Sequence, residues 1–154
     1  MLSLEAPKIS DTETIWHLRN DVATRRELGL KVISYSECLD WIANFVEGKS
    51  KETLWVAKDD KLGIVGFVTL RYDNDMAHIG VSIGSAFRGQ GHGQHAIKLA
   101  TEYEMNLTRP MNRRLLAHIR SENYKALFAF ESAGYKEVGT IKQGQHEYFI
   151  YEYK

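Results

Sequence analysis

The sequence has 154 residues, of which 44% are hydrophobic and 26% charged, and its 20 Lys and Arg residues balance its 20 Asp and Glu residues at zero net charge. This length predicts a single domain, 1–154, with one core and no room for a second full-sized domain. The neutral charge argues against general electrostatic binding of nucleic acid or anionic lipid, so we expect a small-molecule partner.

The cysteine content and the apolar runs bear on location. Cys38 is the one cysteine and cannot form an internal disulfide, which suits a reducing compartment, so we expect a cytoplasmic protein. No signal-peptide pattern precedes Pro7. The densest apolar run, Leu62–Val68, is far shorter than the roughly 18 residues of a membrane span, so no membrane partner is expected.

The N-terminal third has helical periodicity. Apolar residues between Ile15 and Val22 follow helical spacing behind Ser10 and Asp11, either of which can cap a helix. A second helix is indicated by five apolar residues at helical spacing before Gly48: Cys38, Trp41, Ile42, Phe45 and Val46. Residues on such a stripe, Cys38 and Trp41 included, are expected in the core.

From residue 53 the pattern changes to β-rich runs. Polar segments short enough for hairpins separate Thr53–Lys58, Leu62–Tyr72 and Met76–Ile83, which predicts an antiparallel meander. A glycine-rich loop over 84–93 leads into a helix, and a strand over Leu115–Ile119 follows. A strand, a helix and a second strand in this order predict two parallel strands.

The C-terminal part adds a helix and a hairpin. The helix is expected over Asn123–Ala133, and the runs Tyr135–Ile141 and Glu147–Tyr153 indicate a closing hairpin. We therefore predict an α/β (mixed α+β) fold with three layers, in which a mixed central sheet of about seven strands carries helices on both faces.

The loop Arg88-Gly89-Gln90-Gly91-His92-Gly93 is the place to look for chemistry. Free N–H groups at a helix N-terminus attract anions, and glycine lets a phosphate approach the backbone, although a tight turn explains the glycines equally well. Residues 91–96 fit a dinucleotide fingerprint, but Arg113 and Arg114 stand where an acid is needed. A Walker loop is excluded because no Gly-Lys-Ser/Thr follows.

Two motifs link the chain to a known family. One consists of Arg88, Gly91 and Gly93 in the loop, and the other of Asn123, Ala126, Gly134 and Tyr135 downstream. With both motifs in order, the sequence resembles the GNAT superfamily of N-acetyltransferases from Ile9 to the final strand. The resemblance implies a GNAT-type fold whose fourth and fifth strands splay apart, and direct acetyl transfer to an amine in a ternary complex.

The resemblance also implies the co-substrate acetyl-coenzyme A. Its pyrophosphate would lie on the loop amides and its pantetheine arm along the fourth strand, and N–H groups near Val81 would stabilise the oxyanion. Gly80 would permit the bulge usual in the family. The cofactor-binding residues expected on this basis are Val81, Ser82, Ile83, Arg88, Gly89, Gln90, Gly91, His92, Gly93 and Asn123.

The expected catalytic residues are His78 and Tyr124. Many relatives have a Glu where His78 stands, and a histidine can accept the proton of the amine instead. Strand parity also fits a partly exposed histidine without a catalytic role. The usual acidic Tyr is Phe130 here, so Tyr124 is the substitute, although a thiolate with a thiol pKa of about 8.5 can also take its proton from solvent.

The remaining histidines give no metal site. His92 and His95 form a His-x-x-His pair that is poor zinc geometry, so no metal is expected, and His17, His118 and His146 are interpreted as ordinary surface or core residues.

The acceptor is a small-molecule amine by this reasoning. Residues 18–41 resemble the branch that acetylates nucleotide-linked amino sugars, and Arg19, Arg25 and Arg26 could grip a diphosphate or form a solvated helix face. A peptide N-terminus or a polyamine as acceptor, a non-catalytic acyl-coenzyme A-binding module, and a homodimer are all left open.

Overall fold

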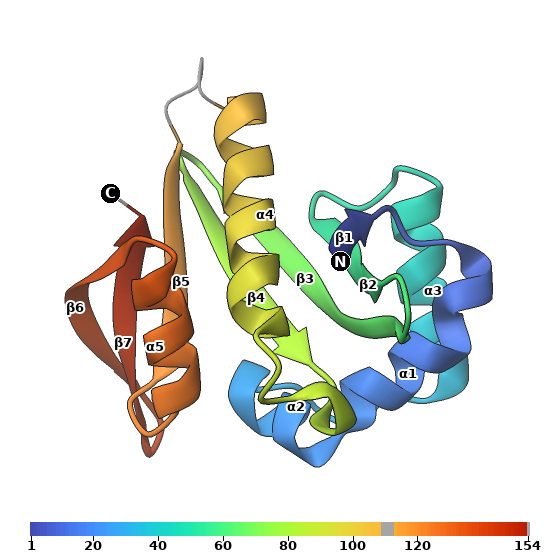
Figure 1. Cartoon of the computed structure of the whole chain (residues 1–154), viewed down its shortest axis with the longest axis horizontal. Coiled ribbons are helices and arrows are strands. Elements are labelled where there is room, and N and C mark those ends of the chain that lie inside the picture. Colours follow the sequence, from blue (N-terminus) through green and yellow to red (C-terminus); the bar gives the residue numbers. More distant parts are fainter. Residues whose placement is uncertain (109–112, 154) are drawn as a thin grey trace.

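The computed structural model describes residues 1–108 and 113–153, and its centre is a seven-stranded sheet in the order β1-β2-β3-β4-β5-β7-β6 (Figure 1). The strands are β1 Leu2–Glu5, β2 Thr53–Asp59, β3 Gly63–Asp73, β4 Met76–Ile83, β5 Arg114–Arg120, β6 Tyr135–Gln143 and β7 His146–Tyr153. The helices are α1 Thr12–Asn20, α2 Val22–Leu28, α3 Tyr35–Val46, α4 His92–Thr108 and α5 Tyr124–Ser132, with short 3₁₀ turns at Ile9–Asp11 and Ser85–Phe87.

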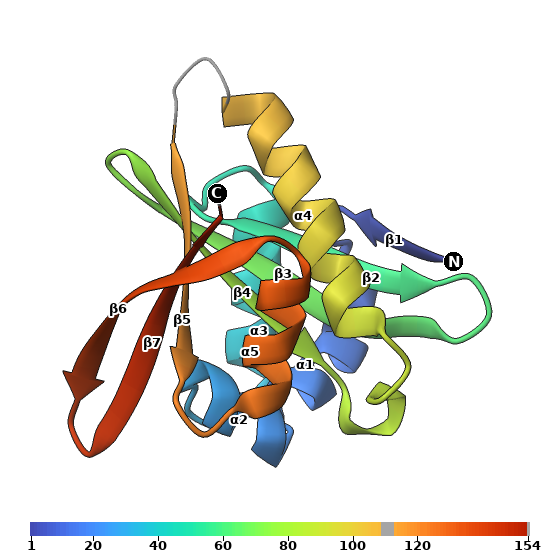
Figure 2. The ribbon, with the colours of Figure 1, turned by 60° about the vertical axis from the view of Figure 1, so that its left-hand side comes forward.

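Helices cover both faces of the sheet. Figure 2 shows α4 and α5 in front of it and α1, α2 and α3 behind it. Only β4 and β5 pair in parallel among the described strands, and the other neighbours are antiparallel. The predicted meander, parallel crossover and closing hairpin are therefore confirmed, as is the mixed three-layer fold. No helix in the described residues is long and apolar enough to cross a membrane.

Each helical layer packs on its own core. Ala96, Ile97 and Ala100 of α4 are buried against the sheet. On the opposite face, Cys38 and Ile42 of α3 are fully buried, which confirms their predicted core positions. The α3 stripe therefore anchors that helix to the sheet by apolar burial.

Two features of the N-terminal part differ from expectation. β1, which no apolar run predicted, pairs with β2 at the sheet edge. The first helix is broken at Asp21, whose backbone leaves the helical region and whose carboxylate accepts the N–H of Thr24 at 3.2 Å, starting α2. Asp11 precedes α1 as expected, but its carboxylate accepts the N–H of Lys8 at 2.9 Å and does not cap the helix.

The sheet opens between its two parallel strands. β4 and β5 share three residue pairs, from Met76↔Arg114 to His78↔Leu116, and then separate (Figure 1). We call the opening beyond His78 and Leu116 the seam. On its other side β4 pairs with β3 without a register shift, so the bulge expected at Gly80 is wrong: Gly80 lies opposite Thr69 in an unbroken ladder.

Candidate active site

The edge of β4 presents backbone groups to the seam. Arg114 donates its N–H to the carbonyl of Asp75 at 2.7 Å, so Asp75 faces β5, and Gly84 donates its N–H to the carbonyl of Val65 at 2.8 Å, so Gly84 faces β3. Backbone groups alternate in direction along a strand. Ile79 and Val81 therefore point their N–H and C=O groups into the seam.

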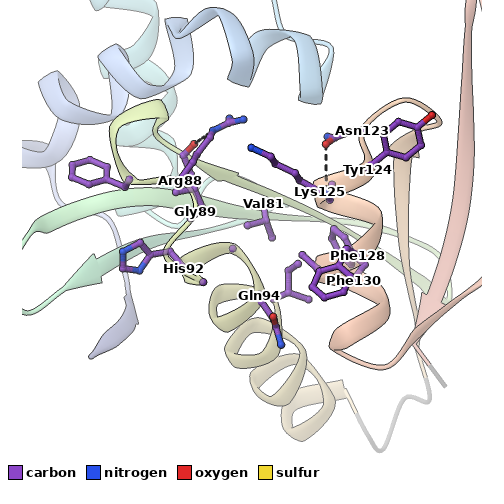
Figure 3. A pocket seen from close by; sticks show the side chains of 17 residues that line it. Val81, Arg88, Gly89, His92, Gln94, Asn123, Tyr124, Lys125, Phe128 and Phe130 are labelled. Carbon is purple, nitrogen blue, oxygen red and sulfur yellow. Dashed lines mark hydrogen bonds between the residues drawn. The ribbon is translucent and has the colours of Figure 1, made fainter.

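A cavity of about 550 Å³ opens on the α4 and α5 side of β4, and we call it the loop cavity (Figure 3). Its walls come from β4, the glycine-rich loop, α4 and α5. Nine of the residues expected at the site line it: Val81, Ile83, Arg88, Gly89, Gly91, His92, Gly93, Asn123 and Tyr124. The two sequence motifs, which lie far apart in the chain, thus meet around one space.

The loop presents free amides to this cavity. Gly89 and Gly91 have φ angles of 79° and 82°, which side chains rarely adopt. The first α4 bond runs from the N–H of His95 to the carbonyl of Gly91 at 3.1 Å, so the first three amides of the helix have no helical acceptor. Arg88 Nε donates to the carbonyl of Ile83 at 3.0 Å and ties the loop to the end of β4. The arrangement suits an anion such as a pyrophosphate.

A second cavity of about 360 Å³ lies on the α1 and α3 side of the sheet, and we call it the basic pocket. It is lined by Arg19, Leu30, Trp41, Glu52, Phe67, Thr69, Arg71, His78, Ile79, Gly80 and His118. Gly80 belongs to the basic pocket and Val81 to the loop cavity. Because these residues are neighbours on β4, the two cavities meet at the seam from opposite faces of the sheet.

A family model described as an acetyltransferase (GNAT) domain matches residues 1–136. The chain belongs to the GNAT acetyltransferase family. It is therefore an N-acetyltransferase by family. A sequence search of curated proteins finds no match.

Solved structures of GNAT proteins share the fold. A GNAT-family acetyltransferase from Bacillus anthracis superposes with a TM-score of 0.82 at 15% identity, over 98% of this chain and 93% of that one. Spermidine N-acetyltransferase from Vibrio cholerae, in complex with CoA and spermine, gives 0.81 at 23% identity, over 97% and 94%. The aminoglycoside acetyltransferase AAC(6')-Ib, in complex with coenzyme A, gives 0.82 at 14%, over 99% and 94%. At these identities the likeness shows the fold.

Two expected cofactor residues of this GNAT domain lie outside the loop cavity. The side chain of Ser82 points to the other face of β4, where its Oγ shares a hydrogen bond with Thr24 Oγ1 at 2.8 Å, and its backbone alternates toward β3. Gln90 is exposed and does not line the cavity. Parity along β4 accounts for Ser82, because neighbouring residues of a strand point to opposite faces.

The α5 wall combines a cap, an exposed ring and a buried ring. Asn123 caps α5 by accepting the N–H of Ala126 on its Oδ1 at 3.3 Å. Tyr124 is 76% exposed, and Figure 3 shows its hydroxyl turned away from Arg88. Phe130 is buried and packs edge-to-face on Tyr135, with ring centroids 5.0 Å apart. Phe130 thus forms an apolar wall where many GNAT enzymes have a Tyr.

The sequence motifs did not include two further cavity residues on α5. Lys125 and Phe128 both line the loop cavity, and Lys125 extends over it in Figure 3. Their positions two and five residues after Asn123 put them near the family motif, which was the available signal. An ammonium group at this place adds positive charge opposite the loop amides.

His78 lies on the floor of the basic pocket together with a histidine that was interpreted as ordinary. The His78 and His118 rings lie edge to face with centroids 5.2 Å apart. His78 Nδ1 is buried without a hydrogen-bond partner among the described residues. Burial, and after it the charge of Arg71, lowers the pKa of both imidazoles, which favours their neutral form at pH 7.

Of the arginines expected near the acceptor, one reaches the pocket. Arg19 lies over the ring of Trp41, with its Cζ 4.3 Å from the ring centroid, and both line the basic pocket. Arg25 instead donates from Nε to the carbonyl of Asn20 at 3.1 Å, and Arg26 is exposed on α2 outside the pocket lining. The broken first helix explains this difference, because α2 carries Arg25 and Arg26 away from the α1 surface.

Within residues 1–108 and 113–153, no three His, Cys, Asp or Glu side chains are grouped to hold a metal ion. His92 is buried at the start of α4, with no partner on its Nε2 in this part of the chain.

Proposed function

We propose that this enzyme transfers the acetyl group of acetyl-coenzyme A to a primary amine of a small molecule, by direct attack within a ternary complex. The observation that carries the proposal is the meeting of two cavities at the seam from opposite faces of the sheet. One cavity offers helix-terminal amides for a pyrophosphate, and the other offers a neutral imidazole beside the same stretch of β4. A donor and an acceptor can thus approach one point from two sides.

The loop cavity fits coenzyme A. The amides of His92, Gly93 and Gln94 would hold the pyrophosphate, and the pantetheine arm would take the place of a strand beside β4. The free N–H of Val81 would face the thioester oxygen. The cofactor contributes a thioester, whose carbonyl carbon accepts the amine nitrogen.

His78 is the proposed general base. As the nitrogen bonds to the carbonyl carbon and the C–S bond breaks, the amine proton passes to a neutral His78 imidazole, and the thiolate takes a proton from Tyr124 or from solvent. The lowered pKa keeps His78 in the form that accepts a proton at pH 7. A buried Nδ1 without a protein partner is consistent with this role.

For the acceptor we propose an amino sugar linked to a nucleotide. Arg19 and Trp41, from the segment that resembles the sugar-acetylating branch, line the basic pocket. Among the described lining residues a polyamine would meet two arginines and one carboxylate, Glu52, which disfavours it. A peptide N-terminus is the alternative acceptor.

An acceptor screen that follows release of the coenzyme A thiol tests the proposal. The panel contains a nucleotide-linked amino sugar, a free amino sugar, a short peptide and spermidine, each with acetyl-coenzyme A. Fastest turnover of the nucleotide-linked sugar supports the proposed acceptor. Tight coenzyme A binding without turnover of any amine would instead make the chain a non-catalytic acyl-coenzyme A-binding module.

A further inference from the structure

The basic pocket holds two arginines that lack a carboxylate partner. Arg19 reaches it from α1 and Arg71 from β3. Neither guanidinium forms an ion pair with a carboxylate of the described residues. An unpaired guanidinium in a cavity wall is free to bind an anion through two parallel N–H groups.

Arg19 is the stronger indication of an anion site, because its guanidinium is partly buried. Its Nε is buried and has no hydrogen-bond acceptor among the described residues. Burial also lowers the pKa of Arg19, which shows that its charge is partly removed from water. Its Cζ lies over the face of Trp41, and Glu37 and Glu52 act on the charge only from beyond ion-pair distance. A ligand oxygen would supply the acceptor that the protein does not.

The described residues that line the basic pocket carry an excess of positive charge. Among the described residues that line the pocket, Arg19 and Arg71 are the basic side chains and Glu52 is the one acid, and the lowered pKa of the two histidines favours their neutral form at pH 7. A concave site with excess positive charge concentrates anions.

Arg71 ties the anion to the reacting amine. Arg71 lies directly opposite His78 in the β3–β4 ladder, and both side chains point to the basic pocket. Side chains opposite each other in antiparallel strands have Cβ atoms about 5 Å apart. A small molecule whose anionic group binds Arg71 can therefore also reach His78 and the seam with its amine.

We infer that Arg19 and Arg71 form an anion-binding site that selects an acceptor carrying a carboxylate or phosphate group on the same molecule as its amine. The inference rests on the proposed function, because it assigns the acceptor to the basic pocket. It deepens that function by naming the two residues that recognise the charge and by extending the acceptor class to amines with a carboxylate.

Matched ligand pairs test the site without requiring turnover. We would titrate the enzyme–coenzyme A complex calorimetrically with glucosamine 6-phosphate against glucosamine, and with glycine against glycinamide. The anionic member of at least one pair is expected to bind about tenfold more tightly or better. A preference in the sugar pair identifies phosphate as the group, and a preference in the glycine pair identifies carboxylate.

Equal binding in both pairs, no binding by any of the four ligands, or tighter binding of the members that lack the anionic group would overturn the inference. Thiol release measured with the same ligands reports separately on the proposed function. Charge-dependent binding without turnover would leave the anion site standing and remove the assigned activity.

Single substitutions assign the preference to the two arginines. Arg71→Gln is expected to reduce the preference to about twofold or less, Arg71→Lys to retain part of it, and Arg19→Gln to weaken it. Arg26→Gln, an exposed arginine outside the pocket, is the matched control and is expected to retain the full preference. Coenzyme A affinity should stay constant in all four variants. Full preference in both Arg71→Gln and Arg19→Gln would contradict the assignment.

Discussion

His78 and His118 meet edge to face across the two parallel strands, with ring centroids 5.2 Å apart and ring planes at 82°. Both lie in the basic pocket. Burial lowers the pKa of both imidazoles, the charge of Arg71 lowers both further, and His118 adds to the effect on His78, so both rings stay neutral to lower pH than an isolated imidazole. The proposed base, His78, would therefore be a neutral imidazole at the seam.

Replacing His78 tests the proposed base. His78→Ala is expected to lower kcat by a factor of about 10² to 10⁴, because general base catalysis contributes that much, while coenzyme A affinity stays unchanged. Thiol release with the best acceptor of the screen is the measurement. His146→Ala, an exposed histidine on β7, serves as control. Full activity of His78→Ala would remove His78 as the base.

The pH dependence of turnover follows from the same residue. As the proposed base, His78 must be neutral to accept a proton, so kcat should fall on the acid side with a midpoint below the unperturbed value of about 6.5, because burial and Arg71 lower the pKa of His78. Arg71→Gln removes the charge that opposes protonation and should move this midpoint to higher pH. The measurement uses an acceptor amine that carries no carboxylate or phosphate, and an unchanged midpoint would show that another group controls the acid limb.

Stability should depend on pH for the same reason. The lowered pKa values mean that the unfolded chain binds protons on His78 and His118 that the folded chain does not bind near pH 6. The free energy of unfolding is therefore expected to rise with pH through that range and to fall in acid. Urea unfolding at pH 5.5 and 7.5 measures the difference, which should be smaller in a variant with both His78→Asn and His118→Asn. An equal difference in the two proteins would assign the effect to other groups.

The glycine-rich loop can be tested by binding alone. Arg88→Glu places a negative charge beside the free amides of α4 and removes the hydrogen bond to the carbonyl of Ile83, so the Kd for coenzyme A is expected to rise about tenfold or more. Isothermal titration is the measurement. Arg26→Glu makes the same change of charge on α2 and should bind normally. Unchanged affinity in Arg88→Glu would show that the loop does not hold the pyrophosphate.

The departing thiolate offers a test of Tyr124. Because Tyr124 is 76% exposed and a thiol has a pKa of about 8.5, water can share in protonating the thiolate, and Tyr124→Phe is expected to lower kcat less than tenfold. Tyr103→Phe, an exposed tyrosine on α4, is the control. A loss near a hundredfold would instead assign the proton transfer to Tyr124 alone.

Local patterns predicted most of the fold. The apolar stripe of α3 and the alternating runs of β2 to β4 contain their own periodicity, so their positions followed from the sequence. β1 was missed because a four-residue strand is too short for a pattern, and its pairing with β2 is a long-range contact. The break at Asp21 was missed because the sequence does not show whether an Asp caps a helix. Only the structure shows that the Asp21 carboxylate accepts the N–H of Thr24.

The site was predictable to the extent that it depends on motifs. The loop and the α5 residues lie in continuous segments, whereas the basic pocket is made by strand register. Arg71 comes to His78 through the β3–β4 ladder, and His118 comes to it through the pairing of Leu116 with His78. The sequence spacing of these residues does not indicate that they are neighbours in space. His118 was therefore interpreted as an ordinary residue, and Arg71 was not predicted at the site.

Because β4 and β5 pair over only three residues, the sheet that lies between the two cavities is open at the seam. The sheet lies between the loop cavity and the basic pocket, and the seam begins where the third residue pair ends. An acetyl group that entered on coenzyme A through the loop cavity would leave on the acceptor amine through the basic pocket. On the proposed function, donor and acceptor would enter and leave from opposite faces of the sheet and would not share an entrance.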